Sequence, residues 1–165
     1  MNINMKSLKE LLNESILKTA KDKLLDSYGW TVFKSVSAHP KDKSELKKTI
    51  DQAIKLRGNN VDLNWIDTSK IEDMSMLFSG TEFNGDISEW DVRRVKYMNM
   101  MFMYSKFNGD ISEWDVRNVE DMNHMFNKSE FSGDLSKWNV RKVKNMYAMF
   151  KKSPLEKHPP RWYED

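Results

Sequence analysis

The stretch that decides the fold is FNGDISEWDVRRVKYMNMMF, residues 83–102, because nearly the same letters return twice. FNGDISEWDVRNVEDMNHMF occupies residues 107–126, and FSGDLSKWNVRKVKNMYAMF occupies residues 131–150. Each copy begins 24 residues after the previous one. A fixed period of this length is the signature of stacked repeat units, each of which buries its apolar side chains against the next unit.

Weaker copies lie on both sides of these three. VDLNWIDTSKIEDMSMLF, residues 61–78, keeps the apolar pattern one period earlier. One period later, Leu155 falls in the Phe position and Trp162 in the Trp position, although Pro159 and Pro160 interrupt that copy. Proline has no N–H to donate to a further strand, so it is typical of a stop. We therefore predict four repeat units over residues 59–154 and a C-terminal cap over residues 155–165.

Two periods are visible inside each unit. Val95, Met98, Met101 and Phe102 are spaced by three and four residues, which predicts a short helix. The segment 87–92 is short and ends in a β-branched residue, which predicts a strand. The expected fold class is therefore α/β, a short leucine-rich-repeat-like solenoid of four strand–helix units with parallel strands and an N-terminal helical cap. Trp90, Trp114 and Trp138 are expected to form a structural ladder in its core.

The repeat FNGDISEWDVRNVEDMNHMF resembles the BspA-like repeat, also called the Mycoplasma lipoprotein-associated family of unknown function. The resemblance extends over residues 60–154. It implies a leucine-rich-repeat-like fold and a role in adhesion or protein contact, with no established enzymatic activity. Members are often surface lipoproteins, and this chain departs from that setting because it shows no signal sequence and no lipobox cysteine.

The N-terminal part lacks the repeat. Residues 1–26 are expected to form an amphipathic helix, since leucines recur at helical spacing between Lys and Glu over residues 7–25. Residues 27–58 are expected to be a capping segment, in which the aromatic stretch 28–33 forms a strand or a packed turn and a second helix follows. Asp42 with Glu45 resembles a capping box at its start, and Gly58 is a typical C-terminal stop.

Composition excludes several classes of protein. There are 27 Lys and Arg against 25 Asp and Glu, so the net charge of +2 gives no reason to expect a nucleic-acid partner. The chain contains no cysteine, which rules out disulfides and thiolate chemistry. No apolar run is long enough to span a bilayer and no secretory signal is visible, so we expect a cytoplasmic protein or one held within a phage particle.

Two ladders of repeated polar residues are candidate sites. Asp86, Asp110 and Asp134 form a carboxylate ladder, but one Asp per unit is too few for a Ca²⁺ shell, so we expect these side chains to accept backbone N–H groups and no metal or cofactor to bind. Arg93 and Arg117 follow Asp91 and Asp115 by two residues, which predicts self-paired surface charges. No arrangement of catalytic residues can be assembled, so we expect no enzyme.

Positions that differ between copies are free to recognise a partner, because stacking does not require them. The candidate partner-binding residues at such positions are Glu89, Glu113, Lys137, Met103, Asn127, Lys151, Tyr104, Lys128 and Lys152. The sequence therefore predicts a non-enzymatic interaction module that presents a repeat face to a protein partner. The alternative is a structural or packaged component of a phage-like particle, with the N-terminal helix as its address.

Overall fold

The computed structural model of the chain describes residues 30–31, 34–35 and 38–163. The chain divides into two compact units, Met1–Ala38 and His39–Asp165. The predicted amphipathic helix over residues 7–25, with the address proposed for it, lies outside the described residues. Of the aromatic stretch 28–33, Trp30 and Thr31 are described and are helical, and the other residues lie outside the described part of the chain.

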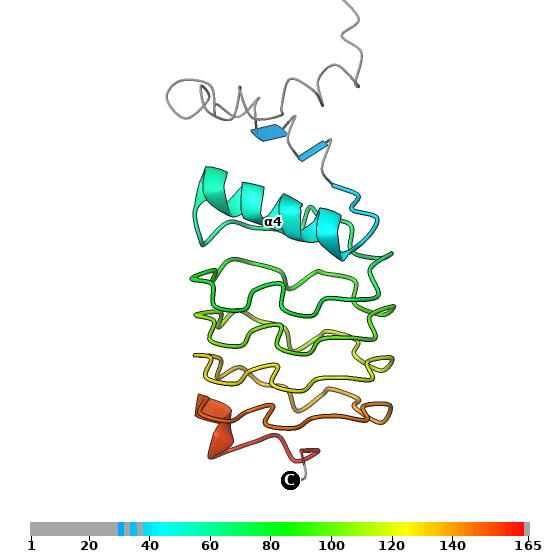
Figure 1. Ribbon diagram of the computed structural model, residues 1–165, viewed down its shortest axis with the longest axis vertical. Helices are drawn as coiled ribbons and strands as arrows, with labels where there is room; N and C mark the ends of the chain where they lie inside the picture. Colours follow the sequence, from blue (N-terminus) through cyan, green and yellow to red (C-terminus); the bar gives the residue numbers. More distant parts are fainter. Residues whose placement is uncertain (1–29, 32–33, 36–37, 164–165) are drawn as a thin grey trace, which may run out of the picture. The chain divides into compact units, whose positions relative to one another are not determined.

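Helix α4, Lys43–Arg57, opens the second unit and has the ends that its sequence predicts. The Asp42 side chain accepts the N–H of Glu45 at 2.9 Å, and the Gly58 N–H donates to the carbonyl oxygen of Ile54 at 2.7 Å. Gly58 has a φ of 85°, a conformation that favours glycine. Leu46, Ile50 and Ala53 are fully buried on one face of α4, which covers the first repeat unit (Figure 1).

Below α4 the chain runs through four stacked coils, one for each repeat unit (Figure 1). Residues 59–82 are coil 1, 83–106 coil 2, 107–130 coil 3 and 131–154 coil 4. Single parallel bridges join Asp73 to Tyr97, Tyr97 to Asp121 and Asp121 to Asn145. Over residues 39–163 these bridges are isolated and lie outside any strand, and the helices are α4 and the short 3-10 helix η1, Pro154–Glu156. The predicted α/β solenoid of strand–helix units is therefore wrong.

The segments expected to be helices are instead chains of tight turns. We call residues 73–80, 97–104, 121–128 and 145–152 the bridged segments. In coil 2, Met98, Met100, Phe102 and Tyr104 donate their N–H groups to carbonyl oxygens of coil 3 at 2.9 Å. The intervening Met101, Met103 and Ser105 donate to the carbonyl three residues earlier, at 3.1–3.2 Å. Alternate amides thus donate to the neighbouring coil. An α-helix does not allow this, because each of its interior amides donates to a carbonyl within the same helix.

Positive φ angles make this alternation possible. They fall on Met76, Met100, His124 and Ala148, and again on Gly80, Tyr104, Lys128 and Lys152. A left-handed residue costs roughly 1–2 kcal/mol when it is not glycine. Except at Gly80, the cost recurs at the same two positions of each coil.

The predicted strand over residues 87–92 also closes into turns. The Trp90 N–H donates to the carbonyl of Ile87 at 3.2 Å, and the Val95 N–H donates to that of Val92 at 3.0 Å. A β-branched residue at the end of the segment is compatible with a strand or with a turn. The sequence pattern therefore does not distinguish the two, and the predicted strand is wrong. The segment nevertheless buries Ile87, Trp90 and Val92.

Aromatic residues at the same position of successive repeats stack through the core. The ring centroids of Phe78 and Phe102 lie 5.6 Å apart, those of Phe102 and Phe126 5.5 Å, and those of Phe126 and Phe150 5.9 Å, with interplanar angles of 2–12°. The tryptophans of the predicted ladder are 4% exposed, and each indole N–H donates to a backbone carbonyl of the preceding coil. The ladder thus satisfies the polar atom of each indole while burying its ring.

The repeat register continues into the C-terminal segment. The Trp162 indole stacks on Trp138 with centroids 6.4 Å apart and donates to the carbonyl of Leu135 at 2.7 Å. The position of Trp162 is therefore the one that the repeat period predicts. The rest of the segment departs from the repeat at its start, where the 3-10 helix η1 lies.

Candidate functional site

The bridged segments form a face of the stack on which large side chains remain exposed. Met76, Tyr97, Tyr104 and Tyr147 have exposed fractions of 51%, 46%, 51% and 71%. All four belong to bridged segments, one or two per coil, in coils 1, 2 and 4. We call this surface the bridged face. Exposed tyrosines on a rigid backbone supply contact area at low cost in side-chain entropy, as binding surfaces require.

Neighbouring coils hold two of these tyrosines in place. The Lys128 ammonium donates to the Tyr104 hydroxyl at 2.8 Å and lies 4.7 Å from the centre of its ring. The His124 ring meets Tyr147 edge-on, with centroids 5.4 Å apart. A cation over an aromatic face and an edge-to-face ring pair are both attractive. These contacts hold the side chains of Tyr104 and Tyr147 against the neighbouring coil.

Several predicted partner-binding residues lie on this face. Tyr104, Lys128, Lys151 and Lys152 are exposed, and Met103 is half-buried. Asn127 differs, because it is 6% exposed and its amide contacts His124 Nδ1 at 3.2 Å. Position 127 therefore varies between copies although its side chain is buried, and Asn127 is not part of the bridged face.

Glu89, Glu113 and Lys137 belong to a different segment of the coils. All three are exposed, beside the buried tryptophans that follow them in sequence. Glu113 forms an ion pair with Lys137 one coil later, and the Glu89 N–H donates to the Asn64 side chain at 2.9 Å. In the described chain, no hydrogen bond or ion pair joins this group to the bridged face. The candidate residues thus form two separate groups.

A row of alternating charges runs along the start of the bridged segments, and sequence analysis missed it. Glu72 pairs with Lys96 at 2.8 Å, and Glu120 pairs with Lys144 at 2.6 Å, so the order along the stack is acid, base, acid, base. The Lys96 ammonium beside Glu72 holds the pKa of that carboxyl below its usual range, and Lys144 does the same for Glu120. Opposite charges at the same position of successive repeats were the signal in the sequence.

The carboxylate ladder closes turns. Asp86, Asp110 and Asp134 each accept the N–H of the serine two residues later, at 2.8–2.9 Å. These hydrogen bonds hold the pKa of each carboxyl below its usual range. Within the described residues, no three His, Cys, Asp or Glu side chains gather into a group suited to a metal ion.

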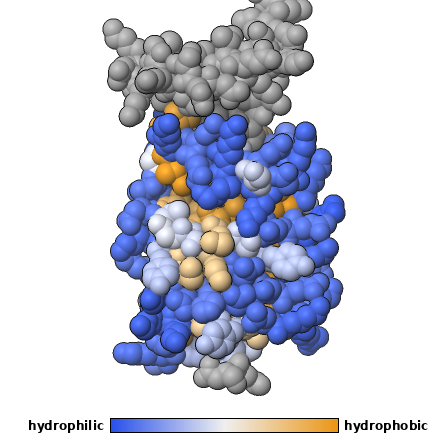
Figure 2. Space-filling view, in the orientation of Figure 1, coloured by the Kyte–Doolittle hydropathy of each residue, from blue (hydrophilic) through white to orange (hydrophobic). Residues whose placement is uncertain are grey.

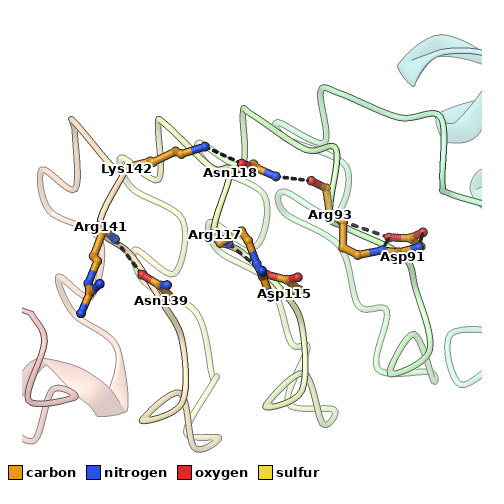
Figure 3. A network of polar contacts seen from close by, with 8 residues as sticks. All are labelled: Asp91, Arg93, Asp115, Arg117, Asn118, Asn139, Arg141 and Lys142. Atoms are coloured by element: carbon orange, nitrogen blue, oxygen red, sulfur yellow. Dashed lines mark hydrogen bonds and ion pairs between the residues drawn. The ribbon is translucent and has the colours of Figure 1, made fainter.

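The arginine row is shown in Figure 3, where charged and amide side chains line one edge of the stack. Arg93 binds Asp91 through two bonds of 2.9 and 2.7 Å, and Arg117 binds Asp115 at 2.7 Å. In coil 4 an asparagine replaces the aspartate, and its side chain accepts the backbone N–H of Arg141 at 3.3 Å. The row is thus neutralised in coils 2 and 3 and basic in coil 4.

The comparisons identify the chain at the level of its family. A family described as "Mycoplasma protein of unknown function, DUF285" matches residues 44–162, which span α4, the four coils and the C-terminal segment through Trp162. The chain belongs to this family. We found no match among curated proteins or among solved structures. Among the helices of the described chain, none is long and apolar enough to cross a membrane.

Proposed function

We propose that the protein is a non-enzymatic interaction module and that the bridged face binds a protein partner. The observation that carries the proposal is the set of exposed tyrosines on this face, Tyr97, Tyr104 and Tyr147. Tyrosine is enriched where proteins bind one another, because it combines a large apolar ring with a hydroxyl that finds a polar partner. Figure 2 shows a paler, more hydrophobic band between strongly hydrophilic flanks on the visible side of the molecule.

The other repeated surfaces are less suited to this task. The carboxylates at Asp86, Asp110 and Asp134 are engaged by backbone N–H groups, and the guanidinium groups of Arg93 and Arg117 are engaged by aspartates. A partner would have to displace those contacts. The tyrosine rings already lie in solvent, so covering them removes apolar surface from water without breaking an internal ion pair.

The adhesion or protein-contact role that the BspA-like repeat implies fits this proposal. Stacked coils repeat the same exposed positions once per repeat unit, so a partner meets a row of related contacts rather than a single pocket. The differing residues in that row, such as Tyr104, Lys128 and Lys152, would select which partner binds.

Affinity capture with the full-length chain tests the proposal. The triple variant Tyr97→Ser, Tyr104→Ser, Tyr147→Ser should lose the captured protein while keeping its fold, because all three side chains are exposed. The control replaces Arg93, Arg117 and Arg141 by Ser on the arginine edge and should retain it. Direct titration with the purified partner then measures the loss. Equal capture by the native chain and the tyrosine variant would contradict the proposal.

A further inference from the structure

The end of the bridged face in coil 4 has an open row of backbone donors. In coil 3, Met122, His124, Phe126 and Lys128 donate their N–H groups to carbonyl oxygens of coil 4 at 2.8–2.9 Å. The equivalent donors in coil 4 are Met146, Ala148, Phe150 and Lys152. Within the described chain, no residue accepts a hydrogen bond from these four amides. They are spaced by two residues, as in the three filled rows above them.

Two apolar side chains of coil 4 are also less buried than their counterparts in the earlier coils. Met74, Met98 and Met122 are fully buried, whereas Met146 at the same position of coil 4 is half-buried. Val143 differs from Val119 in the same way. A groove of about 580 Å³ lies here, lined on one side by residues of the coil 4 segment 146–151 and on the other by Glu156, Pro159 and Tyr163.

Charge indicates what fits the groove. Coil 3 has six acidic and two basic residues, whereas coil 4 has one acidic and six basic residues. The row Glu72, Lys96, Glu120, Lys144 alternates in sign and ends on a lysine at the open edge. An acidic residue stacked on Lys144 would continue the alternation. A basic segment would place like charges side by side, which is unfavourable.

We propose that this open edge binds an extended, acidic segment of a partner protein, which lies parallel to residues 145–152 as an added bridged segment. Four of its carbonyl oxygens, at alternate residues, accept the N–H groups of Met146, Ala148, Phe150 and Lys152. Its first acidic side chain pairs with Lys144, and its apolar side chains cover the half-buried Met146. Addition of a peptide to an exposed backbone edge is a known mode of recognition. The proposal rests on the proposed function, since it names one partner chemistry and the edge that takes it.

The chain itself supplies the probe. A peptide with the sequence EDMNHMFN, copied from residues 120–127 and blocked at both ends, already fits a donor row of this kind in the stack. Titrated into the full-length chain, it should protect the amides of Met146, Ala148, Phe150 and Lys152 from hydrogen exchange. Their counterparts in coil 3, Met122 and His124 among them, are bonded already and should not change. A scrambled peptide of the same composition should protect none.

Two charge reversals in coil 4 form a matched pair. Lys144→Glu should weaken peptide binding about tenfold, because it replaces an attraction by a repulsion at the edge. Lys137→Glu makes the same change in net charge and also breaks an ion pair with coil 3, but Lys137 is not part of the row that Lys144 ends beside the bridged segment. It should leave peptide binding unchanged. Equal weakening by both variants would reduce the effect to general charge attraction and overturn the proposal.

Other outcomes are equally decisive. Peptide binding that leaves the four amides exchanging, or no binding by the folded chain, would rule the groove out. Protection of the same amides in the free protein, increasing with protein concentration, would show that a second copy fills the edge instead. Tyr147 lines the groove, so the double variant Tyr97→Ser, Tyr104→Ser separates the two proposals. Both of its positions lie in coil 2, so it should bind the peptide normally. The two proposals therefore fail separately.

Discussion

The Nζ atom of Lys144 lies 2.6 Å from Oε2 of Glu120, one coil earlier in the stack. The same position is glutamate in coil 1 and lysine in coil 2, whose side chains pair at 2.8 Å. Charges of alternating sign at one repeat position meet their opposite only when equivalent positions of neighbouring coils lie side by side. They therefore favour the register in which each coil is offset from the next by one full repeat. A slipped register would lose these contacts.

The row of alternating charges predicts that reversing one charge lowers the stability of the protein, and that salt reduces this loss. Lys96→Glu places three glutamates in a line, Glu72, the new residue and Glu120, and should lower the melting temperature most at low ionic strength, where exposed charges are screened least. Inverting all four charges of the row restores the alternation and should recover the melting temperature. Thermal melts at two NaCl concentrations measure both. An unchanged melting temperature for Lys96→Glu would show that the row contributes nothing to stability.

The buried tryptophans predict a large effect in the middle of the stack. Trp114→Ala should lower the free energy of unfolding by roughly 3–5 kcal/mol, because it leaves a cavity between coils. Trp114→Phe keeps most of the apolar area but leaves the Ile87 carbonyl without its indole donor, so a loss of about 1–3 kcal/mol is expected. Urea unfolding followed by circular dichroism separates the two variants, and equal losses would mean that the hydrogen bond is immaterial.

The left-handed positions predict opposite effects at adjacent lysines. Lys152 has a φ of 59°, whereas Lys151 beside it is not among the residues with positive φ. Lys152→Gly should raise the free energy of unfolding by up to about 1 kcal/mol, since the relief of left-handed strain exceeds the backbone entropy that glycine loses. Lys151→Gly only increases the backbone entropy that is lost on folding, so it should lower the free energy of unfolding. The reverse order in chemical unfolding would contradict this account of the bridged segments.

The carboxylate ladder predicts acid sensitivity. The serine N–H and hydroxyl groups hold the pKa values of Asp86, Asp110 and Asp134 below 3.8, the ordinary value that applies in the unfolded chain. Below that ordinary value the unfolded state binds more protons than the folded state, so the stabilisation is present above it and is lost as the pH falls through the folded-state pKa. Asp110→Asn retains an acceptor oxygen without the charge. Its urea midpoint should therefore decline less than that of the native chain between pH 5 and pH 3, and a parallel decline would show that the turn does not favour the charged form.

Local signals in the sequence were sufficient for some features. Asp42 and Gly58 predicted the ends of α4, because the bonds that cap a helix form within a few residues of chain. The repeat period likewise predicted which side chains stack, including Trp162 on Trp138. Apolar residues at the same position of each repeat must meet in a stack, whatever backbone conformation they adopt.

The repeat period is thus enough to predict the register and the buried ladders, whereas the backbone of each coil and its exposed surface depend on contacts between coils. Residues 95–102 have helical spacing, yet their amides alternate between their own turn and the next coil, since bonds between coils offset the strain of left-handed residues such as Met100. Such bonds join residues that are nearly a full repeat apart, so no short stretch of sequence reveals them. The same holds for the variable positions. Glu113 is paired with Lys137 and Asn127 is buried, while Tyr104 stays exposed, because each outcome depends on the side chain that the neighbouring coil presents.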